Sequence, residues 1–103
     1  QIQGFHFVPV IEIKRELGVT HTMFFRSLAQ LPEGWVTEVR ADGATLAYKS
    51  GTVDIELEAQ CERRIALMRI PYTPANFRYK GLTDIEQTQF QARFDLTFQR
   101  GGG

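Results

Sequence analysis

The sequence predicts an α+β fold: a two-layer sandwich in which an antiparallel sheet of about four to six strands carries an N-terminal and a C-terminal helix on one face. Three observations support it. A helix-type stretch follows the first strand-type run, a long series of alternating runs comes next, and the closing segment starts with a helix-capping signal. The length of 103 residues, with 43% hydrophobic and 23% charged residues, indicates a single domain over residues 1–103.

The first strand is expected over residues 4–14. Pro9 cannot donate a ladder hydrogen bond, so this strand is expected either at a sheet edge or with a bulge. Apolar side chains recur there at every second position, namely Phe5, Phe7, Ile11 and Ile13. Thr20 is then a candidate N-cap for a helix of about three turns, which Pro32 and Gly34 would end. The buried side of that helix would comprise Met23, Phe24, Leu28 and Leu31.

Residues 35–62 carry strand patterns divided by two turn dipeptides, Asp42-Gly43 and Ser50-Gly51. After the second turn, apolar and acidic residues alternate in TVDIELEA. The inward positions are expected to be Val53, Ile55 and Leu57, and the outward positions Asp54, Glu56 and Glu58. The acidic row is expected to pair with Arg or Lys on a neighbouring strand rather than to bind a cation.

Residues 63–81 predict one long strand, or two strands joined at the PYTP stretch of residues 71–74. Residues that precede proline are held extended, so an irregular crossing is expected there. Near the end of this run, Phe77 and Tyr79 are expected on one face and Arg78 and Lys80 on the other.

The closing segment from Thr83 carries two competing patterns. Apolar and polar residues alternate over residues 89–99, which is typical of a half-buried strand. Thr83 and Glu86, however, have the spacing of a capping box, and the segment is rich in helix-forming residues. We therefore expect a helix, followed by a flexible tail at residues 101–103 because glycine is preferred just past a helix end. Its buried side would hold Phe90, Phe94 and Phe98.

This helix would also carry a second, smaller apolar stripe on nearly the opposite side, formed by Ile85, Ala92 and Leu96. A helix that lies on one open sheet needs only one apolar stripe. The second stripe therefore predicts a further contact, either with the N-terminal helix or with a second copy of the chain in a symmetric homodimer.

The order strand, helix, antiparallel strands, helix resembles that of the helix-grip folds, which hold apolar ligands between the sheet and the C-terminal helix. The resemblance implies a pocket lined by Phe and Met in that place. The FQRGGG ending is also similar to that of some short bacterial proteins.

The twelve basic residues balance the twelve acidic ones, which argues against strong, non-specific nucleic-acid binding. The balance is uneven along the chain: residues 33–62 hold seven acids and two bases, and residues 63–103 hold seven bases and three acids. We expect the two segments to pair within the fold. The alternative is a basic binding face formed by Arg63, Arg64, Arg69, Arg78 and Lys80.

The sequence offers little for catalysis or metal binding. His6, His21 and Cys61 show no ligand spacing, so no metal, cofactor or catalytic role is expected for them. A single cysteine excludes an internal disulfide and fits a reducing, cytoplasmic setting, although the absence of an initial Met leaves a removed leader open. No apolar run is long enough to span a membrane.

Two partial motifs do not hold. Arg64 and Arg69 resemble the arginine pair at the start of PilZ domains, which bind cyclic dinucleotides, but they are separated by four residues where the family pattern has three. The later Asp/Asn-x-Ser-x-x-Gly element of that family is absent. Phe77 and Tyr79 are similar to the base-stacking aromatics of RNA-binding sheets, but a second aromatic motif is missing, so core packing is favoured.

Together these patterns favour a non-catalytic module that binds another protein or a copy of itself. The alternative is a small-molecule binding domain with a pocket for an apolar ligand between the sheet and the C-terminal helix. An enzyme is the third hypothesis.

Overall fold

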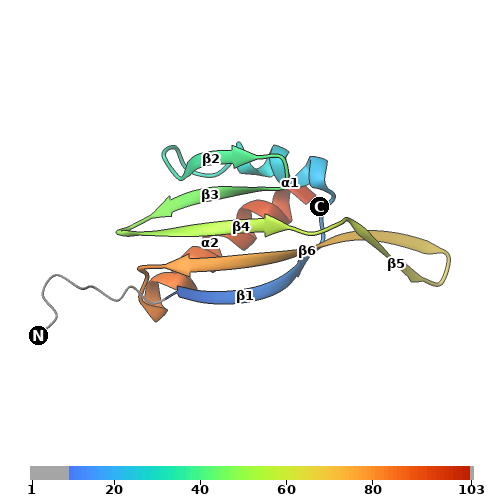
Figure 1. Cartoon of the computed structure of the whole chain (residues 1–103). Helices are drawn as coiled ribbons and strands as arrows, with labels where there is room; N and C mark the ends of the chain where they lie inside the picture. The colour runs from blue at the N-terminus through green and yellow to red at the C-terminus, as the bar shows by residue number, and fades with distance from the viewer. Residues whose placement is uncertain (1–9, 103) are drawn as a thin grey trace, which may run out of the picture.

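Alternating apolar runs and two capped helical segments fold into two layers, a six-stranded antiparallel sheet and a pair of helices behind it (Figure 1). The computed structural model describes residues 10–102, so Phe5, His6, Phe7 and Pro9 lie outside the described residues. The predicted α+β sandwich is confirmed. The strands are β1 (Val10–Leu17), β2 (Val36–Arg40), β3 (Gly43–Tyr48), β4 (Gly51–Leu57), β5 (Cys61–Ile65) and β6 (Met68–Lys80), and the helices are α1 (His21–Leu28) and α2 (Asp84–Gly102).

The strand order in the sheet is β1-β6-β4-β3-β2, and β5 pairs with β6 off this path. The first strand is thus at an edge of the sheet, which is one of the two alternatives that Pro9 predicted. The central strands β4 and β6 place the predicted residues inward: Val53, Ile55, Phe77 and Tyr79 are all buried. Their outward neighbours include Asp54 and Arg78, which face each other across the β4–β6 ladder.

The first two hairpin turns lie one residue earlier than predicted. Arg40 pairs with Gly43, so the turn residues are Ala41 and Asp42, and Gly43 is already in the strand. The glycine is required by close approach, because a Cβ atom on Gly43 would collide with the carbonyl oxygen of Ile55. The next turn shows the same shift.

In that turn Tyr48 pairs with Gly51, and Lys49 takes the left-handed conformation with a φ of 53°. A Cβ atom on Gly51 would meet the carbonyl oxygen of Lys80. Both glycines therefore mark a strand that lies close to a neighbouring backbone.

The prediction of an irregular crossing at residues 71–74 (PYTP) was wrong. The β6 strand continues through Pro71 and Pro74, and the break lies earlier, at the hairpin turn Ala66-Leu67. Proline is tolerated in a strand that has a free side. Within the described structure, residues 68–72 pair with β5 alone, and pairing with β4 begins only at Ala75.

The helix α1 begins as predicted, with Thr20 Oγ1 accepting a hydrogen bond from the backbone N–H of Met23 at 3.1 Å. It ends at Leu28, about one turn earlier than expected, although Leu31 beyond it is still buried. Gly34 has a φ of 90°, which suits the chain reversal into β2.

The closing segment is a helix, and the capping box forms. The backbone N–H of Glu86 donates to Thr83 Oγ1 at 3.1 Å, and the backbone N–H of Thr83 donates to Glu86 Oε1 at 2.9 Å. The helix runs on to Gly102, so Gly101 does not end it as expected. Glycine inside a helix costs only about 1 kcal/mol relative to alanine, and one turn of a long helix tolerates that cost.

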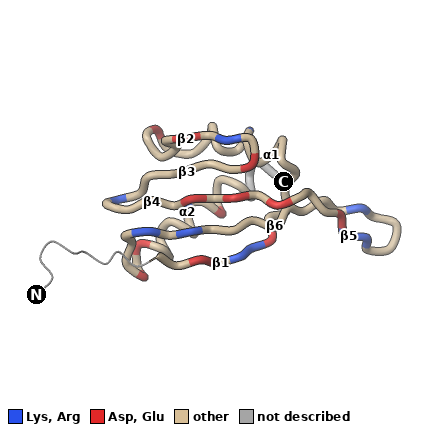
Figure 2. The backbone as a smooth tube through the Cα atoms, viewed as in Figure 1, with Lys and Arg blue, Asp and Glu red and all other residues tan. Residues whose placement is uncertain are grey.

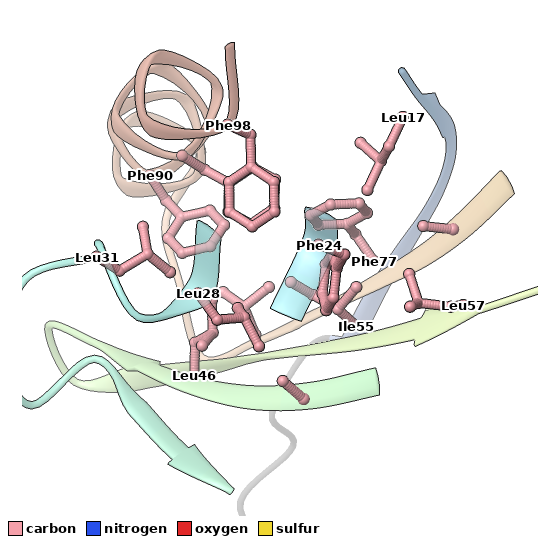
Figure 3. Packing of buried hydrophobic residues seen from close by; sticks show 14 of the residues in the cluster. Leu17, Phe24, Leu28, Leu31, Leu46, Ile55, Leu57, Phe77, Phe90 and Phe98 are labelled. Atoms are coloured by element: carbon pink, nitrogen blue, oxygen red, sulfur yellow. The ribbon is translucent and has the colours of Figure 1, made fainter. Parts of the chain in front are cut away.

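The core lies between the helices and the sheet, and aromatic rings dominate it (Figure 3). Phe90, Phe94 and Phe98 are buried, which confirms the period of 3.6 residues. The centroids of Phe94 and Phe98 are 4.0 Å apart, and Phe94 also meets Phe77 of β6 at 5.3 Å. The N-terminal helix joins them, because Phe24 lies 5.4 Å from Phe98.

Candidate functional site

A β-hairpin arm projects beyond the sheet, formed by residues 61–72 of β5 and the first part of β6 (Figure 1). In this hairpin Ile65 pairs with Met68 across a two-residue turn, Ala66-Leu67. Ala66 adopts a φ of 55° in that turn. No other described strand pairs with these residues. An isolated two-stranded hairpin is marginally stable, so the arm depends on the sheet at its base.

The tip of the arm is apolar and exposed. Ile65 is 53% exposed and Met68 is 62% exposed, and the side chain of Leu67 at the turn is fully exposed. Three large apolar side chains next to one another on a projecting hairpin are unusual for a surface, where single exposed apolar residues are the norm.

Arginines lie directly behind this tip, as the charge distribution in Figure 2 shows. Arg64 of β5 pairs with Arg69 of β6, so the two guanidinium groups are on the same face of the hairpin. Like charges directly opposite each other destabilise a strand pair. Neither arginine has an ion-pair partner among the described residues.

Arg63 lies on the other face of the arm and is anchored to the body of the molecule. Its guanidinium donates to Glu16 of β1 at 2.8 Å and stacks over the ring of Tyr72, 4.5 Å from the ring centroid. The contact with Glu16 raises the pKa of Arg63. Arg63 therefore fixes the base of the arm rather than its free surface.

The five basic residues considered as one face are divided by the structure. Arg63, Arg64 and Arg69 are in the arm, whereas Arg78 and Lys80 are near the other end of β6. Arg78 is nine positions after Arg69, which is about 30 Å along an extended strand. The structure therefore places them in two groups.

The open face of the sheet, opposite the helices, carries a network of ion pairs. Arg78 donates to Glu12 of β1 at 2.8 Å, and it lies 3.8 Å from Asp54 of β4. Arg40 of β2 contacts the same carboxylate at 2.8 Å. The hydrogen bonds from Arg78 and Asn76 lower the pKa of Glu12.

The acidic row is thus partly paired, as expected. Asp54 binds two arginines, and Glu58 binds Lys14 of β1 at 2.7 Å. The main acidic partners of the later basic residues are in β1, however, and not in the segment 33–62. These ion pairs form because β1 lies beside β6 in the sheet, and the composition of the chain does not reveal that neighbourhood.

The candidate metal and nucleophile residues make local contacts. The ring Nε2 of His21 lies 2.9 Å from the backbone oxygen of Glu58, and Cys61 Sγ lies 3.4 Å from the backbone oxygen of Ala59. Among residues 10–102, no group of three or more His, Cys, Asp or Glu is placed to hold a metal ion. His6 is outside the described residues.

The second stripe of α2 is exposed along its length. Ile85 is 70% exposed and Leu96 is 51% exposed, and Ala92 between them is exposed too. The N-terminal helix α1 contacts α2 through Phe24 and Phe98, on the buried side. It therefore does not cover the stripe.

A hollow of about 370 Å³ lies where the first turns of α2 cross the β1 edge of the sheet. It is lined by Ile13, Tyr79, Asp84, Gln87, Thr88 and Gln91. Sequence reasoning missed this site, because Tyr79 was expected only to pack in the core, and Gln91 carries no motif.

Comparisons of the chain with family profiles, curated proteins and solved structures gave no match. No helix among the described residues is long and apolar enough to cross a membrane.

Proposed function

We propose that the chain is a non-catalytic binding module that docks a partner protein through the arm of residues 61–72. The observation that carries this proposal is the exposed apolar tip of Ile65, Leu67 and Met68, which is not part of the hydrophobic core of the described structure. Burial of each such side chain in a partner would contribute roughly 1.5–3 kcal/mol.

The chemistry of the arm also indicates the kind of surface it fits. Arg64 and Arg69 repel each other across the hairpin, and a carboxylate from a partner would relieve that repulsion. The partner site is therefore an apolar groove with acidic residues at its rim. Because Ile65 and Met68 point to one face of the hairpin and Arg64 and Arg69 to the other, the groove would enclose both faces of the arm, with the apolar contacts giving affinity and the charges giving orientation.

The alternative of an apolar ligand between the sheet and α2 has weaker support. The rings of Phe90, Phe94 and Phe98 occupy the space in which a helix-grip ligand would lie. The exposed stripe of Ile85, Ala92 and Leu96 supports self-association as a second candidate, because nothing described covers it.

A site-specific photo-crosslinker tests the proposal. It is placed at Leu67, and in a control variant at Glu56, which is exposed on β4. The expected result in the cells that make the protein is a discrete adduct with one protein from position 67 and none from position 56. The same adduct should be lost when Arg64→Glu and Arg69→Glu are introduced.

The partner identified in this way is then purified and its affinity measured. Equal adducts from positions 67 and 56, or an affinity for the purified partner that the two arginine substitutions leave unchanged, would refute docking through the arm. An adduct between two copies of the chain would assign the arm to self-association instead.

A further inference from the structure

The hollow beneath the start of α2 is lined by two residues whose buried polar atoms make no hydrogen bond among residues 10–102. Tyr79 is only 1% exposed, and its hydroxyl has no hydrogen bond within the described structure. The side-chain nitrogen of Gln91 is also buried and has no partner in the part of the chain that the structure describes. Buried polar groups are nearly always hydrogen-bonded, so two such groups lining one hollow need an explanation.

Neighbouring residues hold both groups in place. The carbonyl oxygen of the Gln91 side chain accepts a hydrogen bond from Arg15, which in turn binds Asp95 at 2.9 Å. Because Arg15 can only donate, the Gln91 amide must direct its oxygen to Arg15 and leave its nitrogen free. Gln91, which lines the hollow, therefore holds a fixed N–H donor.

The Tyr79 ring is fixed by the aromatic core, with Phe77 at 6.2 Å and Phe90 at 6.0 Å between centroids. Burial raises the pKa of Tyr79, so its hydroxyl remains protonated at neutral pH. A protonated hydroxyl can donate to a ligand. Two of the residues that line the hollow thus carry donors of fixed position.

The rim of the hollow presents acceptors. Asp84 supplies a carboxylate, and the hydroxyl of Thr88 donates to the Asp84 backbone oxygen at 3.0 Å, which leaves its lone pairs available. The Gln87 side-chain nitrogen contacts the Leu82 backbone oxygen at 3.4 Å, so its carbonyl oxygen is free to accept. Ile13 forms an apolar wall.

We propose that this hollow binds a small uncharged organic molecule, whose carbonyl or hydroxyl oxygen accepts from Tyr79 and Gln91 and whose N–H or O–H groups donate to Asp84 and Thr88. Its volume of about 370 Å³ lies within the usual range of ligand pockets. Negatively charged molecules are disfavoured, because Asp84 lies on the rim and Asp95 neutralises Arg15. The site lies about 36 Å along β6 from Met68 in the arm.

Three probes of similar shape test the proposed chemistry: benzamide, benzoate and toluene. They are titrated into the full chain, and binding is followed by NMR at the side-chain amide signal of Gln91 and the backbone signals of residues 84–91. We expect benzamide to give saturable shifts there, and benzoate and toluene to bind at least tenfold more weakly. Equal binding of the three probes, or no saturable shift with benzamide, would contradict the proposal.

Two conservative variants test the donors. Tyr79→Phe removes the hydroxyl and keeps the ring, and Gln91→Glu removes the N–H donor and keeps an oxygen for Arg15. Each should weaken benzamide binding at least fivefold. The matched control Gln89→Glu, at an exposed position of the same helix, should leave binding unchanged.

The melting temperature separates a ligand site from a structural one. Since the Tyr79 hydroxyl has no partner in the described structure, Tyr79→Phe should leave the melting temperature unchanged or raise it. A fall of several degrees, together with unaltered benzamide binding, would show that the hydroxyl serves the fold and would refute the proposal. The arm variants do not touch this site, so the two proposals can fail separately.

Discussion

The strand β6 belongs to two regions of the molecule, the body and the arm. Apolar residues recur at alternate positions in both, but the neighbouring elements differ. In the body of the molecule, Phe77 and Tyr79 alternate with polar residues and are buried against α2. In the arm, Met68 and Ile70 also lie at alternate positions, with Arg69 between them, yet Met68 is exposed and β5 is their one described neighbour strand. Apolar alternation therefore predicts a strand, but only the neighbouring elements decide whether its apolar side serves stability or binding.

The largest expected loss in the free energy of unfolding comes from a substitution in the body of the molecule. Phe94→Ala should lower the free energy of unfolding by about 3–5 kcal/mol, because it removes a fully buried ring that contacts Phe77, Phe90 and Phe98. The measurement is urea denaturation of parent and variant. Arg93→Ala, one residue away at an exposed position, is the control and should stay within about 0.5 kcal/mol of the parent. Equal stabilities of the Phe94 variant and the parent would show that the core does not carry the fold.

A smaller loss in the free energy of unfolding is expected from a substitution at the start of α2. Thr83→Ala removes the side-chain acceptor of the Glu86 backbone N–H and should cost about 1 kcal/mol. Thr83→Ser keeps that acceptor and should lose much less. The same denaturation experiment distinguishes them, and a serine variant as unstable as the alanine variant would point away from the cap.

The helix α2 shows how much the sequence could decide. Strict alternation over residues 89–99 predicted a strand, and the Thr83–Glu86 capping box predicted a helix. The capping box was sufficient to predict the helix correctly, and its hydrogen bonds form. In that helix Phe90, Phe94 and Phe98 lie on one side and are buried. A helix with two apolar sides can also produce alternating apolar and polar residues. The capping box was therefore the better guide to the structure of this segment.

Other features depend on contacts between distant segments, and the sequence could not predict them. The glycines at 43 and 51 were interpreted as turn residues, but they are needed for close approach to the backbones of β4 and β6. Pro71 suggested a break, although a strand with one free side accepts it. The hollow at Tyr79 and Gln91 was missed for the same reason, since its parts come from β1, β6 and α2.

The second stripe of α2 provides a test with almost no expected change in stability. If Ile85, Ala92 and Leu96 form a homodimer contact, Leu96→Glu should shift the protein from dimer to monomer and leave its circular dichroism unchanged. Light scattering across a range of concentrations measures the mass. A monomer mass for the parent at high concentration would rule out this contact and leave the arm as the remaining candidate interface.

The most direct test of the contrast between body and arm is the stability of a variant with Ile65→Ser, Leu67→Ser and Met68→Ser. The account predicts a free energy of unfolding within about 0.5 kcal/mol of the parent in urea, because these side chains are largely exposed and lie outside the described hydrophobic core. A loss of about 2 kcal/mol or more would contradict it, since the apolar tip would then stabilise the fold rather than remain available for a partner.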